Sequence, residues 1–319
     1  MTIQQTRPLA IRCRGVRRTY RSGGEAFEAV RGADFDVPAG TITALLGTNG
    51  AGKTSTVELL EGLAPADAGE IRVLGLDPWR DREAVRRSTG VLLQASGFSG
   101  DLSVTETLQM QASLTSGARP IDEVLDELGL LGKRTTRVGQ LSGGEQRRLD
   151  IACALLGDPD VVFLDEPTTG LDVESRRRVW DLVARRRDRG AAIVLTTHYL
   201  DEAQRLADRI ELMHGGRIVR GGTPAEIVAD LPSTVSFATA SLQGAPPLPD
   251  LGQLRVVEHR GTATIETHDL QGSLAALLVW AATHDVHLGA LRAETATLER
   301  AFLTLTSATD TPTMEEHAA

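Results

Sequence analysis

Two hydrophobic patterns follow one another along the chain, and their order predicts the fold. Residues 10–19 and 33–37 alternate apolar with polar positions, which is typical of half-exposed strands. Later apolar residues follow one another without interruption, as in strands that are buried on both faces. Such buried strands are expected at 42–46, 90–94, 161–164 and 191–197. An antiparallel sheet is therefore predicted to lead into a parallel sheet.

Helical periodicity separates the buried strands. Apolar residues at helical spacing predict a helix over 57–63, directly after the first buried strand, and further helices at 175–188 and 200–206. Residues 95–157 form a block that is mainly helical. Strands alternating with helices imply a parallel sheet covered on both faces, so we predict an α/β fold with a helical subdomain inserted at that block.

The pattern changes again near residue 231. We predict one large domain at 1–231, a small C-terminal α/β domain at 232–306, and a disordered tail at 307–319, where the residues are small and polar. The small domain is expected to contain strands at 234–238, 254–259 and 263–267 and helices at 270–282 and around Phe302.

Composition narrows the class of protein. The chain has 319 residues, of which 41% are hydrophobic and 24% charged, as in ordinary globular proteins. Its net charge of −9 disfavours general binding to nucleic acid. Two cysteines supply no disulfide framework and suit a reducing cytoplasm. The apolar run at 274–282 is about half of a membrane span, so we expect that the chain does not cross a membrane by itself.

The segment between the first buried strand and its helix fits the phosphate-binding pattern G-x-x-x-x-G-K-[ST]. Its glycines let the backbone curl, so that successive N–H groups point into one concavity. The helix N-terminus and the charge of Lys53 favour the β- and γ-phosphates, and Thr54 offers a hydroxyl to Mg²⁺. A nucleoside triphosphate site is therefore predicted at Gly47, Asn49, Gly50, Ala51, Gly52, Lys53, Thr54 and Ser55.

A pair of carboxylates ends the third buried strand, at Asp165 and Glu166. Ligands gather at the carboxyl ends of parallel strands, which places this pair beside the phosphate loop. Asp165 is expected to hold Mg²⁺, and Glu166 to orient or deprotonate the attacking water. A strand end that is merely capped is the alternative, which the phosphate loop upstream disfavours.

Residues 141–148 are the most informative segment after the phosphate loop. Ser142 and Glu145 satisfy the capping-box pattern S-x-x-E, and the intervening glycines make this helix start a second anion site. A well-capped helix without further function is the alternative. Together with the phosphate loop and the carboxylate pair, this segment resembles the signature of the nucleotide-binding subunits of ABC (ATP-binding cassette) transporters.

The resemblance implies an ATPase with a RecA-like parallel-sheet core, an antiparallel β subdomain and a helical subdomain. It assigns catalysis to Glu166, His198, Lys53 and Gln94, with ATP and Mg²⁺ as cofactors. Mg²⁺ would be held by Thr54, Gln94 and Asp165. The resemblance also assigns ATP contacts to Tyr20, which would stack on adenine, and to the signature and D-loop residues Ser142, Gly143, Gly144, Glu145 and Asp172.

Residues 197–203 and 298–306 resemble the daunorubicin-resistance branch of this family. Its members carry one cassette and work with a separate ABC-2-type membrane permease. The resemblance implies export of a drug or antibiotic by an ATP-sandwich homodimer at the inner face of the cell membrane, with no nucleic acid partner. The alternative is a soluble ABC ATPase that acts on nucleic acid or ribosomes, which the single motif set and the acidic balance disfavour.

Overall fold

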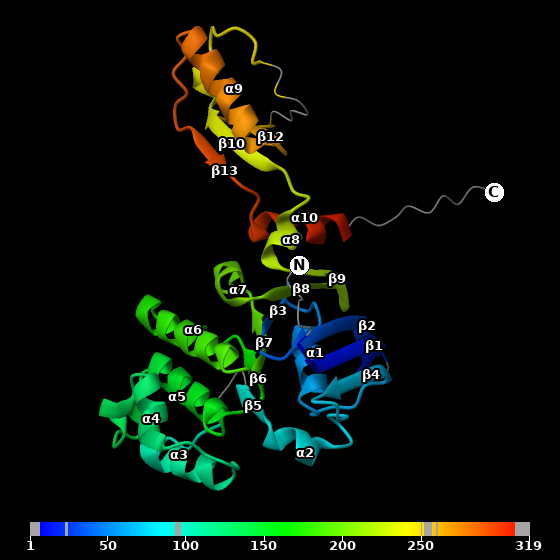
Figure 1. Ribbon diagram of the computed structural model, residues 1–319, viewed down its shortest axis with the longest axis vertical. Helices are drawn as coiled ribbons and strands as arrows, with labels where there is room; N and C mark the ends of the chain where they lie inside the picture. Colours follow the sequence, from blue (N-terminus) through cyan, green and yellow to red (C-terminus); the bar gives the residue numbers. More distant parts are fainter. Residues whose placement is uncertain are drawn as a thin grey trace, which may run out of the picture. The chain divides into compact units, whose positions relative to one another are not determined.

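The computed structural model describes residues 7–22, 25–92, 97–249, 251, 257–259 and 261–309. It divides into two compact units, Met1–Pro224 and Ala225–Ala319, so the division falls a few residues before the boundary suggested by the sequence. The two units are drawn in Figure 1 and are described separately. None of the described helices combines the length and apolar character that a membrane span requires.

An antiparallel sheet opens the first unit. Strands β1 (Leu9–Ser22), β2 (Glu25–Pro38) and β4 (Ala68–Val73) lie in the order β2-β1-β4. Phe35 and Val37 are buried, as the alternating pattern predicts. The strand around them starts at Glu25, earlier than predicted, because β2 pairs with β1 along most of its length, with several bulges.

A six-stranded sheet forms the centre of this unit, in the order β5-β6-β7-β3-β8-β9. Its strands run parallel except β9, which forms a hairpin with β8. Their bounds are β3 Ile42–Gly47, β5 Thr89–Leu92, β6 Val161–Asp165, β7 Ala192–Thr197, β8 Arg209–His214 and β9 Arg217–Gly222. Strand β7 lies between β3 and β6. The phosphate loop follows β3 and the carboxylate pair lies at the end of β6, so a single strand separates the two strands that lead to them.

Both faces of the central sheet are covered, as an α/β fold requires. Ile42 belongs to one hydrophobic cluster and Leu45 to another, on opposite faces of β3. The α/β class is confirmed, but the first helix ends at Leu60, and Leu63 is exposed rather than helical. The helices of this unit are α1 Lys53–Leu60, α2 Arg82–Arg87, α3 Val104–Ser113, α4 Ile121–Glu127, α5 Gly143–Leu155, α6 Val173–Asp188 and α7 Leu200–Leu206.

The second unit has a small core of its own. Its sheet has the order β11-β12-β10-β13, and Leu277 and Trp280 of α9 pack with Phe237 of β10. Ser307–Thr309 are helical, although the sequence placed them in a disordered tail, and 310–319 lie outside the described residues. The elements are α8 Pro224–Val228, β10 Ser233–Ala238, β11 Val257–His259, β12 Thr262–Thr267, α9 Leu270–Thr283, β13 Arg292–Glu294 and α10 Leu298–Thr309.

Candidate nucleotide-binding site

Glycines shape the phosphate loop between β3 and α1. Gly50 and Gly52 have φ angles of 79° and 100°, which favour glycine. A Cβ on Gly52 would lie 2.3 Å from the carbonyl oxygen of Ala29 in β2. A Cβ on Gly47 would lie 2.4 Å from the carbonyl oxygen of Met213 in β8. The loop is therefore pressed against two neighbouring strands, and side chains at these positions would push it out of place.

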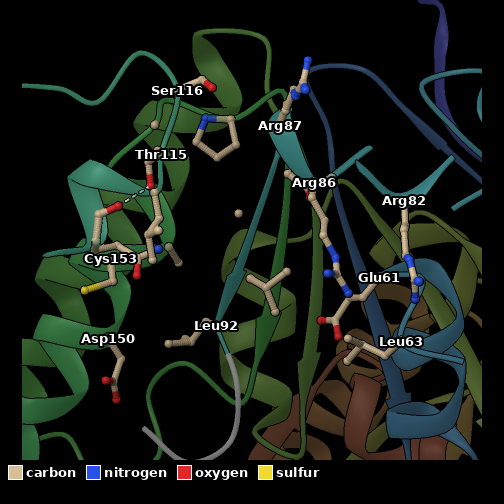
Figure 2. A pocket seen from close by; sticks show the side chains of 18 of the residues that line it. Glu61, Leu63, Arg82, Arg86, Arg87, Leu92, Thr115, Ser116, Asp150 and Cys153 are labelled. Carbon is tan, nitrogen blue, oxygen red and sulfur yellow. Dashed lines mark hydrogen bonds between the residues drawn. The ribbon is translucent and has the colours of Figure 1, made fainter. Parts of the chain in front are cut away.

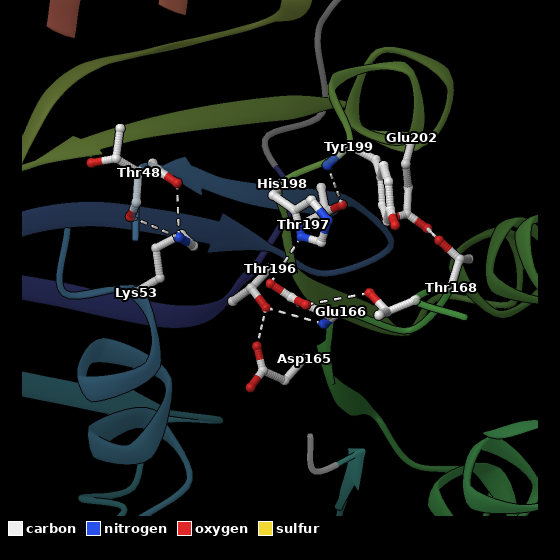
Figure 3. A network of polar contacts seen from close by, with 12 residues as sticks. Thr48, Lys53, Asp165, Glu166, Thr168, Thr196, Thr197, His198, Tyr199 and Glu202 are labelled. Carbon is white, nitrogen blue, oxygen red and sulfur yellow. Dashed lines mark hydrogen bonds and ion pairs between the residues drawn. The ribbon is translucent and has the colours of Figure 1, made fainter. Parts of the chain in front are cut away.

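The start of α1 is arranged for an anion. Gly52 is its N-cap, no side chain caps it, and its first turn contains no acidic residue. The backbone N–H groups there have no partner within the helix, and the helix dipole adds positive potential. The Lys53 ammonium donates to the carbonyl oxygens of Gly47 at 2.8 Å and Thr48 at 3.1 Å, inside the loop (Figure 3). Burial lowers the pKa of Lys53, whereas Glu166 and Asp165 favour its charged form.

The other residues of the phosphate loop differ in exposure. Asn49 and Gly50 are exposed, and Ala51 is buried. Thr54 is exposed and Ser55 is half-buried. The loop thus combines a rigid backbone with accessible polar groups.

A second polar cluster forms where β6 and β7 end. Asp165 lies opposite Thr196 in register, and its Oδ1 accepts a hydrogen bond from the Thr196 hydroxyl. The Glu166 carboxylate lies 3.0 Å from His198 Nδ1, through Oε1 (Figure 3). These contacts follow from the pairing of two parallel strands, because Asp165 ends β6, Glu166 follows it, and His198 follows β7. The sequence did not single out Thr196, although a threonine that ends an otherwise apolar strand was a visible signal.

The signature segment forms the capping box that the sequence predicts. Ser142 Oγ accepts from the Glu145 N–H at 3.3 Å, and the Glu145 carboxylate accepts from the Ser142 N–H at 2.8 Å. Lys133 adds an ion pair with Glu145 at 3.2 Å. Ser142 and Gly143 are exposed, while Gly144 is half-buried. This helix start is thus accessible but already holds a carboxylate of its own.

The remaining predicted residues are dispersed. The Asp172 carboxylate caps α6 by accepting from the Ser175 N–H at 2.7 Å. The Tyr20 hydroxyl donates to Glu58 at 2.9 Å, and the Arg18 guanidinium lies 4.9 Å from the ring centroid. Gln94 lies outside the described residues.

A pocket of about 850 Å³ lies beside the strand that leads to Gln94. The end of α1, helix α2, β5, and parts of α3 and α5 contribute to its lining. Glu61 and Arg86 lie on one side of it, and Asp150 and Cys153 on the other (Figure 2). Burial raises the pKa of Glu61 to about 8, with Asp165 and Glu58 adding to the shift.

The sequence and the fold of the chain match known proteins. Residues 30–169 match the family described as ABC transporter. The daunorubicin/doxorubicin resistance ATP-binding protein DrrA of Streptomyces peucetius is 42% identical over 240 residues, which is 74% of this chain and 71% of that protein. The chain belongs to the ABC transporter family. Residues 226–297 match a second family, described as the C-terminal domain of ABC transporter domain-containing protein-like proteins.

Other relatives agree with this assignment. The doxorubicin resistance ATP-binding protein DrrA of Mycobacterium tuberculosis is 41% identical, over 69% of this chain and 67% of that protein. The Nod factor export ATP-binding protein I of Neorhizobium galegae is 40% identical, over 62% of this chain and 58% of that protein. A solved ATP-binding subunit of an ABC transporter superposes with a TM-score of 0.63 at 26% identity, over 68% of this chain and 91% of that one.

These findings confirm the family, the fold class and the ATPase activity expected from the motifs. The chain is a nucleotide-binding, ATP-hydrolysing subunit of an ABC transporter. A solved bacterial ABC transporter cassette, MJ0796, whose structure is described as dimeric, has the same fold, with a TM-score of 0.61 at 24% identity.

Proposed function

We propose that this chain powers the efflux of a drug or antibiotic through a separate ABC-2-type permease. The similarity to two drug-resistance ATP-binding proteins supports this substrate class. The observation that carries the ATPase chemistry is the pairing of β6 with β7, which brings Glu166 to His198 beside the phosphate loop. The subunit would work at the inner face of the cell membrane, held there by the permease.

ATP and Mg²⁺ fit the residues that are present. The glycines let the loop pack against β2 and β8, and the start of α1 has no side-chain cap, so its backbone N–H groups can donate to a phosphate. Hydroxyl and carboxylate oxygens are the ligands that Mg²⁺ prefers, so Thr54, Asp165 and Gln94 would hold the ion. When bound, Mg²⁺ would neutralise charge on the phosphates.

Three side chains near the carboxyl ends of the strands would have different roles in hydrolysis. Lys53 would exchange its loop carbonyl partners for the β- and γ-phosphates, where its charge stabilises the transition state. Glu166 would orient the attacking water and take its proton, and His198 would contact the γ-phosphate while holding Glu166 through Nδ1. Tyr20 would supply a ring for the adenine.

A second copy would complete each site. Ser142, Gly143, Gly144 and Glu145 of one copy would close over the ATP on the loop of the other, with Asp172 at the joint. The exposure of Ser142 and Gly143 supports this role. The permease would contact the pocket beside β5, because the family resemblance also implies that Gln94, which follows β5, senses the transport partner. The arginines of α2 at its edge suit an acidic segment.

Reconstitution with the permease tests the proposal. We expect the drug to stimulate ATP hydrolysis in vesicles, and Glu166→Gln to lower turnover at least about 100-fold, to a small residual rate, while ATP still binds. Near-normal hydrolysis by Glu166→Gln would exclude its assigned role. Stimulation by RNA or ribosomes, with no response to the permease, would instead favour the alternative function.

A further inference from the structure

Arg147 joins the signature helix to the catalytic end of β6 within one chain. It is the fifth residue of α5, and 9% of its surface is exposed. Its Nη2 donates to the backbone carbonyl oxygens of Asp165 and of Glu166, the latter at 2.8 Å. A single buried cation therefore contacts two consecutive carbonyl groups at the point where the predicted base is placed.

The backbone of Glu166 needs such support. Its φ angle is 47°, in the left-handed region that residues with a side chain rarely adopt. A strained conformation of this kind persists where the surrounding contacts determine it from several sides. On one side the Glu166 N–H donates to the carbonyl oxygen of Thr196 at 3.0 Å, and on the other its carbonyl accepts from Arg147. Together these contacts fix the backbone from which the carboxylate reaches His198.

The charge of Arg147 also suits this position. Burial lowers the pKa of its guanidinium, and the carboxylates of Asp150, Asp165, Glu166 and Glu202 oppose that effect. An arginine keeps its charge under such burial better than a lysine would, and its planar fork donates in fixed directions. The position therefore favours arginine for its geometry as well as its charge.

We propose that Arg147 is a positioning residue for hydrolysis, which holds Glu166 in its left-handed conformation and couples that carboxylate to the signature helix. The inference rests on the proposed role of Glu166. In the sandwich dimer the start of α5 would contact the ATP on the partner copy, whereas Arg147 holds the base for the ATP on its own copy. Five residues of helix, about 7.5 Å, would thus connect the two ATP sites.

Kinetics of Arg147 variants in the reconstituted complex test the proposal. For Arg147→Met we expect kcat to fall about 10- to 100-fold, with KM for ATP almost unchanged, because the base is misplaced and binding is not. Arg147→Lys keeps a cation without the fork, so we expect a smaller loss of kcat. Added to Glu166→Gln, Arg147→Met should cause little further loss, because both changes act through one group.

Arg186 of α6 provides the matched control. It is also a buried arginine, with 2% of its surface exposed, and it pairs with the carboxylates of Glu127 and Asp158. Arg186→Met should lower thermal stability and leave kcat unchanged. If Arg147→Met proves too unstable to purify, Arg147→Lys carries the test alone, with the same expected direction.

Each outcome bears on a different claim. Unchanged kcat in Arg147→Met and Arg147→Lys, with Glu166→Gln inactive, would overturn the inference and leave the proposed function standing. A full additional loss in the double variant would also overturn it. Normal hydrolysis by Glu166→Gln would instead refute the role of Glu166 itself.

Discussion

Two helices of the first unit begin with glycine-rich segments, but their first turns differ in how they can bind an anion. Helix α1 starts at Gly52 with no side-chain cap and no acidic residue in its first turn. Helix α5 starts at Ser142 with a complete capping box, and Lys133 neutralises the Glu145 carboxylate. The hydrogen bond from the Ser142 N–H holds the pKa of Glu145 below its ordinary value, so the carboxylate stays charged.

This difference indicates that the start of α1 binds the nucleotide and that the start of α5 completes the site around nucleotide that is already bound. The start of α1 leaves its backbone donors to a phosphate and adds the charge of Lys53. The start of α5 already holds a carboxylate, so its attraction for a free anion is weaker. Changes at α1 should therefore abolish nucleotide binding, whereas changes at α5 should lower turnover of nucleotide that is already bound.

The largest effect is expected at Lys53, and the chain supplies its own control, because Lys133 is its other lysine. Lys53→Ala should lower ATP affinity and reduce hydrolysis at least about 100-fold, since its charge is removed from the phosphates. Lys133→Ala removes an exposed ion pair worth at most about 1 kcal/mol, so ATP affinity should stay unchanged. Titration with a fluorescent ATP analogue measures both, and an equal loss of affinity would contradict the comparison.

Alanine substitutions of the glycines at the two helix starts should have different effects on the free energy of unfolding. Gly52→Ala would force a Cβ against the backbone of β2 and strain a φ angle of 100°, which should cost about 2 kcal/mol or more in unfolding free energy. No atom lies within 4 Å of a Cβ built on Gly143, so Gly143→Ala should change stability by less than about 0.5 kcal/mol. Urea unfolding gives both values. A stable Gly52→Ala protein would show that the loop is not held against β2.

Glu61, at the C-terminal end of α1, should make the stability of the fold depend on pH. Glu61 is the C-cap of α1 and is buried, so its pKa rises from 4.5 to about 8. The folded state therefore keeps a proton that the unfolded state releases, and stability falls as pH rises from 4.5 to 8. Glu61→Gln removes this penalty, and its stability relative to the wild type should increase by roughly 4 kcal/mol over that window.

Thermal unfolding without nucleotide, at a series of pH values, checks this effect. A difference between Glu61→Gln and the wild type that stays constant with pH would show that the Glu61 carboxyl titrates normally.

The smallest effect is expected at the cap of α5. Ser142→Ala should lower the free energy of unfolding by about 1 kcal/mol, because one N–H of the first turn loses its partner. Ser142→Asp, which can also cap, should restore stability but not hydrolysis, since its charge would repel the phosphate. Recovery of both properties would mean that the cap is the whole role of Ser142.

Much of this arrangement follows from local sequence, and the rest does not. The helix Leu200–Leu206 has the predicted bounds, because apolar spacing and flanking residues define it. Strand β13 was not predicted, because the three residues of Arg292–Glu294 are exposed and are too few to show an alternation of apolar and polar positions. Pairing partners are set by the fold, and a local pattern carries no information about them.

The site shows the same division. The phosphate loop and the carboxylate pair were predicted because each motif is continuous in sequence. The contacts of Thr196 with Asp165 and of Arg147 with Glu166 join different segments of the chain. The spacing of residues within a motif therefore does not predict them. Supporting contacts of this kind become visible when the strands and helices are placed in space.

Mixing two inactive variants tests the shared site most directly. Lys53→Ala loses the phosphate loop but keeps the signature segment. Gly144→Asp keeps the loop, and its acidic side chain at a helix start preserves the fold while repelling the phosphate. A mixed dimer has one intact site, and half of randomly formed dimers are mixed. The account predicts recovery of about a quarter of the wild-type ATPase rate on mixing. A mixture no more active than its parents would contradict it.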